Sequence, residues 1–400
     1  MHFETTTYTA RWIFPIISPP IENGLFTVQG ERIVAVEPAG TRSADVDLGS
    51  VALLPGFVNA HTHLDLSGAR NLIPPTDALH FTDWLSQVIA YRRSRTSEQI
   101  ANDIQIGLNE AMRYGTTIIG DIASAGTSWN ALSQAPIRSI VFREMLGLSE
   151  QRAQQSIQDA EAWLHSTSDT ANTRRGLSPH APYSTSPTIV RWAESQNLPL
   201  AMHIAETPAE LELLETGTGP FVEFLQRVRV WDEHDFPRSW EEIVPRRSSL
   251  WIHANHLPAE HNFPTHGSIV VYCPRTHAAF GHSPHPYREY LARGIRVCLG
   301  TDSLASNPDL NIFAEAELIH ERDPSFSCEL LLEMLTLWGA EALGFGETCG
   351  SLEVGKRADV VAVPLPNIIS ENPYHLLFSD VALKTPIRTL FQGVWRNFAT

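Results

Sequence analysis

The sequence predicts an α/β protein built around a (β/α)8 barrel of the TIM type, with a small β-sandwich domain formed by its N- and C-terminal segments. Apolar, β-branched runs of strand length alternate with amphipathic segments between residues 52 and 301. This alternation is typical of parallel strands joined by helices. Several runs end in His or Asp, as expected where a barrel displays functional side chains at the C-terminal ends of its strands.

The predicted barrel strands and helices follow from length, composition and boundary residues. One predicted helix, 96–115, ends in Gly115, and another, 186–198, begins with Ser186 and Pro187. The predicted strands are residues 52–60, 116–122, 137–142, 174–179, 198–202, 248–252, 268–273 and 296–301.

The two ends of the chain contain short strand patterns and turns rather than the alternation of strands and helices in the middle. Residues 24–36 read as two short strands joined by a turn at Gln29-Gly30, and residues 350–363 read as a turn and a strand. The sequence therefore predicts a barrel at 55–346 and one small β domain assembled from 1–54 and 347–400. A long connection, 208–247, is predicted to form a lid or a wall of the substrate site.

Composition excludes several classes of function. A net charge of −16, from 29 basic and 45 acidic residues, predicts no nucleic-acid partner, because little would neutralise a phosphate backbone. No apolar run reaches the length of about 18 residues that a membrane span requires, and no signal peptide is recognisable at the start. The 4 cysteines show no CxxC spacing, which fits a reducing compartment. We expect a soluble, cytoplasmic protein.

Histidines at strand ends carry the first functional signal. His61 and His63 follow an apolar run, and residues i and i+2 of a strand point the same way, about 6 to 7 Å apart. The His-x-His pair is weak by itself, but His203, His253 and Asp302 also end predicted strands. Imidazoles and a carboxylate converging at one barrel face suit Zn²⁺ or a similar divalent ion with one position left for water.

The chain resembles the amidohydrolase superfamily of metal-dependent barrel hydrolases. The resemblance covers nearly the whole chain and is most similar to its branch of deaminases and chlorohydrolases, aminodeoxyfutalosine deaminases in particular. The motifs that carry it are "PGFVNAHTHLDLSG" (55–68), "LSPHAPYSTS" (177–186), "AMHIAET" (201–207), "WIHANHL" (251–257), "LGTDSLASN" (299–307) and "GSLEVGKRADVVAV" (350–363). The seventh strand departs from the branch, with Tyr272 and Thr276-His277 where relatives often carry His and Ser-Asn.

The resemblance implies that His61, His63, His203 and Asp302 bind one divalent metal ion, with zinc favoured and iron, nickel or manganese as alternatives. Two-metal members of the superfamily commonly use a carboxylated lysine on the fourth strand. The first lysine here is Lys356, and the fourth predicted strand ends in His180 instead. A single-metal centre is therefore favoured.

The resemblance also implies catalytic roles. Glu206 would be the general acid/base, Asp302 would accept a proton from water, and His253 would orient the attacking water, with His256 as the competing choice. Glu206 can reach the same water as His203 only if the strand ends and the chain turns between them. The alternative for Glu206 is an acidic residue of a helix's first turn, since Thr207-Pro208 resembles a helix start.

Substrate contacts are predicted at four residues, each with a structural alternative. His180 and Tyr183 would face the barrel mouth or tether its loop. Arg143 would bind a carboxylate or a ribose hydroxyl, or pair with Glu144 or Asp121. Trp84 would stack on a flat ring or belong to the core.

The predicted function is metal-dependent hydrolytic deamination of an adenine-type amine. The substrate class is an adenosine-like nucleoside: aminodeoxyfutalosine, S-adenosylhomocysteine or methylthioadenosine. Alternatives are a guanine, cytosine or triazine deaminase or chlorohydrolase using the same site, and a metal-free scaffold protein. The resemblance suggests a homodimer.

Overall fold

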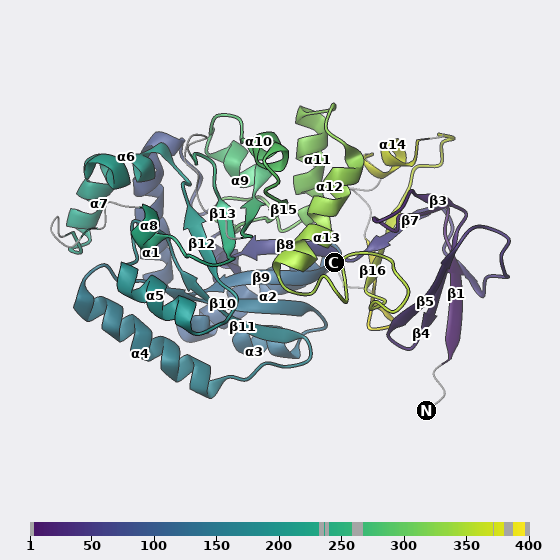
Figure 1. Ribbon diagram of the computed structural model, residues 1–400, viewed down its shortest axis with the longest axis horizontal. Coiled ribbons are helices and arrows are strands. Elements are labelled where there is room, and N and C mark those ends of the chain that lie inside the picture. The colour runs from purple at the N-terminus through teal and green to yellow at the C-terminus, as the bar shows by residue number, and fades with distance from the viewer. Residues whose placement is uncertain are drawn as a thin grey trace.

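Two parallel β-sheets with helices around them form the body of the molecule, and β layers built from both ends of the chain lie beside it (Figure 1). The computed structural model describes residues 4–231, 236, 240–257, 267–370, 372–379 and 387–396. Within these residues, no helix is long and apolar enough to cross a membrane.

The eight parallel strands follow one another in chain order. Four form one sheet in the order β11-β10-β9-β8, and four form a second in the order β12-β13-β14-β15. Every pairing within the two sheets is parallel. The strands are β8 (Phe57–Thr62), β9 (Thr116–Ala123), β10 (Arg138–Met145), β11 (Thr173–Pro179), β12 (Ala201–Ile204), β13 (Leu250–His253), β14 (Ile269–Tyr272) and β15 (Val297–Leu299).

Backbone hydrogen bonds join the two sheets on both sides. At the β11–β12 side, the His203 N–H donates to the His180 carbonyl at 2.8 Å. At the β15–β8 side, the Asp302 N–H donates to the His61 carbonyl at 3.1 Å. The C-terminal ends of strands far apart in sequence therefore meet at one face, where the predicted site residues lie.

Helices connect the strands and cover their outer side. The helix predicted at 96–115 is α2, and Thr96 and Gln99 form a capping box at its start. Gly115 follows it with φ +84°, a conformation that favours glycine. The α-helices up to β13 are α1 (Phe81–Ser94), α2 (Ser97–Arg113), α3 (Trp129–Gln134), α4 (Glu150–Ser166), α5 (Pro187–Ser195), α6 (Pro208–Thr216), α7 (Pro220–Arg227) and α8 (Trp240–Ile243). Those after β13 are α9 (Pro274–Ala279), α10 (Tyr287–Ala292), α11 (Ile312–Arg322), α12 (Cys328–Leu335), α13 (Leu337–Ala342) and α14 (Pro373–Leu377).

The predicted strand at 52–60 is in fact parts of two strands. β7 (Val51–Pro55) pairs with a C-terminal strand, whereas β8 begins the parallel sheet. Gly56 separates them, and a Cβ at this position would lie 2.1 Å from Thr117 Oγ1. The apolar run looks continuous because both strands are buried.

Both ends of the chain contribute to the β layers. The predicted turn at Gln29-Gly30 is confirmed, since β4 and β5 pair antiparallel around it. β16 pairs with β7, so the two ends share a six-stranded sheet of order β18-β17-β16-β7-β2-β3; the other sheet has the order β5-β4-β1-β6. The remaining strands are β1 (Thr5–Thr9), β2 (Trp12–Ile13), β3 (Ile21–Glu22), β4 (Leu25–Gln29), β5 (Arg32–Glu37), β6 (Val46–Asp47), β16 (Val360–Pro364), β17 (Arg388–Phe391) and β18 (Val394–Arg396).

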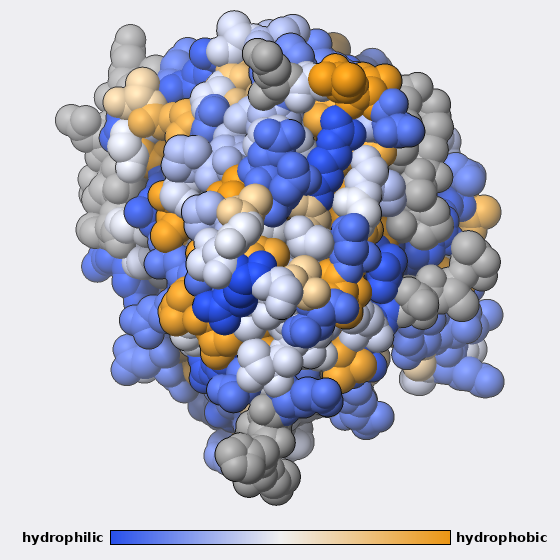
Figure 2. All heavy atoms as spheres, turned by 90° about the vertical axis from the view of Figure 1, so that its right-hand side faces the viewer, coloured by the Kyte–Doolittle hydropathy of each residue, from blue (hydrophilic) through white to orange (hydrophobic). Residues whose placement is uncertain are grey.

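The surface of the molecule on the side of the β layers carries both hydrophobic and hydrophilic residues (Figure 2). Figure 2 shows hydrophobic residues there in small groups among hydrophilic ones.

The long connection at 208–247 contains α6, α7 and α8. Residues 232–235 and 237–239 of it lie outside the described residues, so its predicted role as a lid or wall stays a prediction.

Candidate active site

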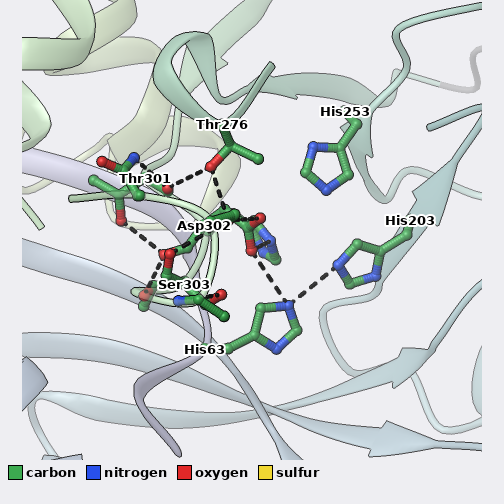
Figure 3. Close-up of polar contacts among 12 residues, drawn as sticks. His63, His203, His253, Thr276, Thr301, Asp302 and Ser303 are labelled. Atoms are coloured by element: carbon green, nitrogen blue, oxygen red, sulfur yellow. Dashed lines mark hydrogen bonds and ion pairs between the residues drawn. The ribbon is translucent and has the colours of Figure 1, made fainter. Parts of the chain in front are cut away.

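Five predicted site residues meet at the C-terminal ends of the parallel strands. We call them the strand-end cluster: His61, His63, His203, His253 and Asp302. His63 Nε2 lies 3.3 Å from His203 Nε2, and His61 Nε2 lies 3.3 Å from Asp302 Oδ1. Figure 3 shows the rings of His63 and His203 turned toward one another. The ligand atoms of His61, His203 and His253 lie within 4.8 Å of one another, as do those of His61, His63 and Asp302.

The protonation states of the strand-end cluster suit metal binding. Burial lowers the pKa of His63, His203 and His253 well below the usual value, so these imidazoles are neutral at pH 7. Burial alone would raise the pKa of Asp302, but its hydrogen bond and charge interaction with His61 outweigh this and leave that pKa lowered. Neutral imidazoles with an ionised carboxylate are a donor set that Zn²⁺ accepts.

The geometry of the strand-end cluster also fits an ion. His61 Nδ1 is buried without a hydrogen-bond partner, and His61 Nε2 has only its 3.3 Å contact with Asp302 Oδ1. Such poorly satisfied buried nitrogens are costly unless something else binds them. Two Zn–N bonds of about 2.0 to 2.1 Å at a tetrahedral angle place their nitrogens about 3.3 Å apart. The His63–His203 separation matches this value.

Glu206 reaches the strand-end cluster through a turn in the backbone. β12 ends at Ile204, and Ala205 adopts a left-handed φ of +48°. The turn brings Glu206 Oε1 to 3.4 Å from His253 Nε2. His253 and Asp302 also have positive φ values, +67° and +59°. Such conformations are unfavourable for residues other than glycine and are concentrated at functional sites.

The electrostatics of Glu206 suit a proton donor. Burial raises the pKa of Glu206 well above its usual range, and the nearby charges of Asp302 and Glu210 raise it further. A carboxyl group with a raised pKa can hold a proton near neutral pH and give it to a substrate.

Glu210 was not predicted and holds the Glu206 turn in place. Its carboxylate oxygens accept hydrogen bonds from the N–H groups of Ala205 at 2.9 Å and Glu206 at 3.0 Å. α6 begins at Pro208 after the N-cap Thr207, and Glu210 is the acidic residue of its first turn. The acidic residue of the helix's first turn, which was the alternative role for Glu206, is therefore Glu210. A Glu two residues after Thr-Pro was the signal in the sequence.

Replacing Glu210 by Gln should change how stability depends on pH. Burial raises the pKa of Glu210 from 4.5 to about 7. Between these pH values the folded chain keeps the proton and the unfolded chain releases it, so ionisation destabilises the folded chain as pH rises. Relative to Glu210→Gln, the free energy of unfolding of the wild-type chain should fall by about 3 kcal/mol from pH 4.5 to pH 7. Urea unfolding at both pH values measures this, with exposed Glu215→Gln on the same helix as the control. Parallel pH profiles for wild type and Glu210→Gln would contradict the assignment.

The structure separates the two candidate catalytic histidines, His253 at the end of β13 and His256 three residues after it. The His253 ring lies 5.4 Å from that of His203 and faces Glu206. The His256 Nε2 atom instead lies 3.2 Å from His282 Nδ1, outside the strand-end cluster. This geometry favours His253 for the catalytic role.

His180 and Tyr183 lie beside the strand-end cluster and also serve the loop they belong to. The His180 ring is 4.8 Å from that of His203, while its Nδ1 lies 2.8 Å from Ser184 Oγ. Tyr183 is buried and stacks on Phe221 at 4.3 Å.

Arg143 and Trp84 are both buried, in different surroundings. Arg143 Nη1 donates to the backbone carbonyl of Glu144 at 3.3 Å, and its Nε has no hydrogen-bond partner. The Glu144 carboxylate pairs with Arg92 instead, so the structure records no Arg143–Glu144 side-chain pair. Trp84 packs against Phe81 and Phe280 in an aromatic group.

A cavity of about 450 Å³ opens beside these residues. Arg143, Arg93 and Arg152 line it, and Glu144 and Ser184 connect it with His180. The acidic residues Glu144 and Asp159 also line the cavity, so its lining carries three basic and two acidic side chains. Arg143 is the most buried of the arginines.

Two further contacts to the strand-end cluster were missed by sequence reasoning. Arg92 pairs with Asp65 at 2.9 Å and with Glu144 at 3.3 Å, and its Nη2 lies 3.4 Å from His63 Nδ1. Ser306 Oγ donates to Asp302 Oδ2 at 2.8 Å. Both Asp65 and Ser306 lie inside quoted motifs, but Arg92 has no local signal because it comes from α1.

Comparison with known proteins identifies the family of this chain. The family model described as "Amidohydrolase family" matches residues 52–399. The chain belongs to the amidohydrolase family. The family membership predicted from the motifs is confirmed.

Among relatives of this amidohydrolase, the 5-methylthioadenosine/S-adenosylhomocysteine deaminase of Moorella thermoacetica is 31% identical over 391 residues, which cover 90% of this chain and 86% of that protein. Among solved structures, Helicobacter pylori aminofutalosine deaminase in complex with methylthio-coformycin has a TM-score of 0.82 at 21% identity, covering 98% of this chain and 100% of that one. An adenosine deaminase from Xanthomonas campestris with bound zinc has a TM-score of 0.78 at 22% identity, covering 97% and 92%. These structures show that the fold is shared.

Proposed function

We propose that this amidohydrolase is a metal-dependent hydrolytic deaminase of adenosine-like nucleosides, with aminodeoxyfutalosine, S-adenosylhomocysteine and methylthioadenosine as the candidate substrates. The observation that carries the proposal is the Glu206 carboxyl group, which is buried, holds a raised pKa and faces His253 at the edge of the strand-end cluster. The relatives with deaminase names support the reaction, and the shared fold supports its dependence on a metal.

One divalent ion, zinc in the first place, would be held by His61, His63, His203 and Asp302. When bound, such an ion lowers the pKa of water from 15.7 to about 7 and so supplies a nucleophile at neutral pH. The neutral imidazoles of His63 and His203 and the poorly satisfied ring nitrogens of His61 support this donor set.

The chain's own residues move the protons. Glu206 starts protonated and gives its proton to the ring nitrogen beside the amine-bearing carbon, so that the ring can accept the electron pair of the new C–O bond. It regains a proton from the newly added hydroxyl group as the adduct breaks down. His253 orients the water through its position next to Glu206. Asp302, which is ionised, takes a proton from the attacking water and passes it to the amine as the C–N bond breaks. One water is consumed and one ammonia is released.

We also propose a closed barrel and a two-domain organisation for this chain. The eight parallel strands form a closed (β/α)8 barrel, supported by the hydrogen bonds that join the two sheets on both sides. The barrel spans 55–346, and 1–54 with 347–400 form the β-sandwich domain, supported by the pairing of β7 with β16. Residues 1–3, 371, 380–386 and 397–400 of the latter lie outside the described residues.

The arginine-lined cavity would receive the substituent on the ribose. Arg143 can donate through its unpartnered Nε to a carboxylate. Replacing Arg143 by Met should therefore raise KM for S-adenosylhomocysteine, which carries a carboxylate, by about 10- to 100-fold. Methylthioadenosine, which has none, should show little change. Steady-state kinetics with both substrates test this, with exposed Arg42→Met as the control. An equal rise for both substrates would remove the assignment.

Two alternatives have less support. Guanine, cytosine and triazine deamination or dechlorination would use the same cluster. An acid at Glu206 favours loss of ammonia over dechlorination, and the name of the Moorella thermoacetica relative favours a nucleoside over a free base or a triazine. A metal-free scaffold would not need neutral imidazoles and a carboxylate assembled at one buried point. A homodimer and a cytoplasmic location stay predictions.

Ammonia release is the test of the proposed reaction. Zinc-loaded protein should release ammonia from at least one of the three nucleosides named above. Adenosine, guanine, cytosine and melamine complete the panel. Release only from guanine, cytosine or melamine, or from none of the panel while zinc is bound, would contradict the proposal.

A further inference from the structure

Three histidines gather next to the strand-end cluster without belonging to it. We call His256, His277 and His282 the second histidine cluster. His256 follows β13, His277 lies in α9 and His282 follows that helix. His256 Nε2 lies 3.2 Å from His282 Nδ1, and the ring centroid of His277 lies 5.1 Å from that of His282. The proposed reaction uses none of the three.

The spacing of the first two nitrogens suits two ligands of one ion. Their separation of 3.2 Å is close to the 3.3 Å between His63 Nε2 and His203 Nε2 in the strand-end cluster. Tetrahedral Zn–N bonds of about 2.0 to 2.1 Å predict nearly the same value. An N–H···N hydrogen bond between the two rings is the ordinary alternative and would also fit this distance.

His277 provides the second observation. Its side chain is only 5% exposed, and its Nε2 is buried without a hydrogen-bond partner. A buried ring nitrogen without a partner is unfavourable, and binding an ion would satisfy it. Burial, reinforced by the neighbouring histidines, lowers the pKa of His277 and of His282 to about 3, so both offer a neutral ring nitrogen at pH 7.

We propose that His256, His277 and His282 bind a second divalent transition-metal ion, with zinc as the probe of choice. His256 and His282 are only half-buried, so an ion can enter from solvent. Among the described residues, the three nitrogens do not lie within 4.8 Å of one another. The proposal therefore requires the ring of His277 to turn when the ion binds.

The site lies against the backbone that positions the proposed catalytic groups. The His256 N–H donates to the carbonyl of Ala205, the residue before Glu206, at 3.0 Å. His285, which stacks on Tyr272, donates from Nε2 to the His253 carbonyl at 2.8 Å. The second ion is thus separate from the first and adjacent to the same turns. The proposal does not rest on the proposed reaction.

Metal content per chain is the test. The full-length protein is stripped with a chelator, reloaded with Zn²⁺, desalted and analysed by mass spectrometry for zinc. We expect two ions per chain in the wild type, one in His256→Asn/His282→Asn, one in His61→Asn/His203→Asn and two in the control His165→Asn, whose side chain is exposed. One ion in both the wild type and His256→Asn/His282→Asn would overturn the second site and leave the first intact. Loss of neither ion in His61→Asn/His203→Asn would overturn the first site instead.

A second measurement covers the case in which the double variant does not fold. Chelator competition against the wild type should remove zinc in two phases, and the single variant His282→Asn should lose only one of them. Cobalt substitution followed by X-ray absorption should show imidazole nitrogen around both ions. A single phase of zinc removal that His282→Asn leaves unchanged would contradict the proposal.

Discussion

Glu206→Gln should lower kcat by about 10²- to 10⁴-fold while the protein keeps its full metal content. Gln has the size and hydrogen-bonding capacity of Glu but cannot carry a proton between water and the substrate ring. Its carbonyl or amide group still fits beside His253, where Glu206 Oε1 now lies at 3.4 Å. Rate loss with retained metal therefore separates proton transfer from assembly of the site.

The measurement is steady-state ammonia release with zinc quantified on the same samples. Glu223→Gln, an exposed acid on α7, is the matched control and should behave as wild type. Because the substrate ring nitrogen must gain a proton, the loss should appear in kcat more than in KM. A Glu206→Gln protein with near wild-type kcat would remove the general acid/base assignment.

His61→Asn should remove one metal ion per chain and lower turnover by at least about 10³-fold, because water would then keep its ordinary pKa near 15.7. His61 is fully buried at the centre of the strand-end cluster, and its ring lies 4.9 Å from that of His63 and 5.0 Å from that of His203. Asn is shorter than His and cannot bring a nitrogen to the same point. The remaining ligands would be too few to hold the ion against dialysis.

Zinc analysis after dialysis, together with ammonia release, checks this result. His375→Asn changes an exposed histidine on α14 and should leave both readouts unchanged. Far-ultraviolet circular dichroism establishes that the variant is folded. A folded His61→Asn protein that retains wild-type metal content would contradict the ligand assignment.

The geometry of this site could be expected from the sequence because strand ends in a barrel meet at one face. His61, His203 and Asp302 are far apart in sequence, yet each follows an apolar run that reads as a parallel strand. The required turn between His203 and Glu206 could also be deduced, because a strand would direct the two side chains to opposite sides. The structure provides that turn at Ala205.

Residues that reach the site from other elements could not be predicted in the same way. Arg92 lies on a helix, and nothing in local periodicity indicates that its guanidinium contacts His63. Ser306 contacts Asp302 because the chain bends back after β15. The division of 52–60 into two strands likewise depends on a tertiary contact, the close approach of Gly56 to Thr117. Periodicity identifies elements, whereas these contacts depend on how the elements pack.

The most direct test of the proposed hydrolytic deamination is to follow the oxygen of water and the nitrogen of the substrate amine through one turnover. Zinc-loaded wild-type protein is incubated with S-adenosylhomocysteine in water enriched in ¹⁸O, and the product is examined by mass spectrometry alongside an ammonia assay. Hydrolytic deamination predicts one heavy oxygen on the purine ring and one ammonia for each product molecule. The same protein with Glu206→Gln should form little of either. A product without solvent oxygen on the ring, or with no ammonia released, would contradict the proposed function.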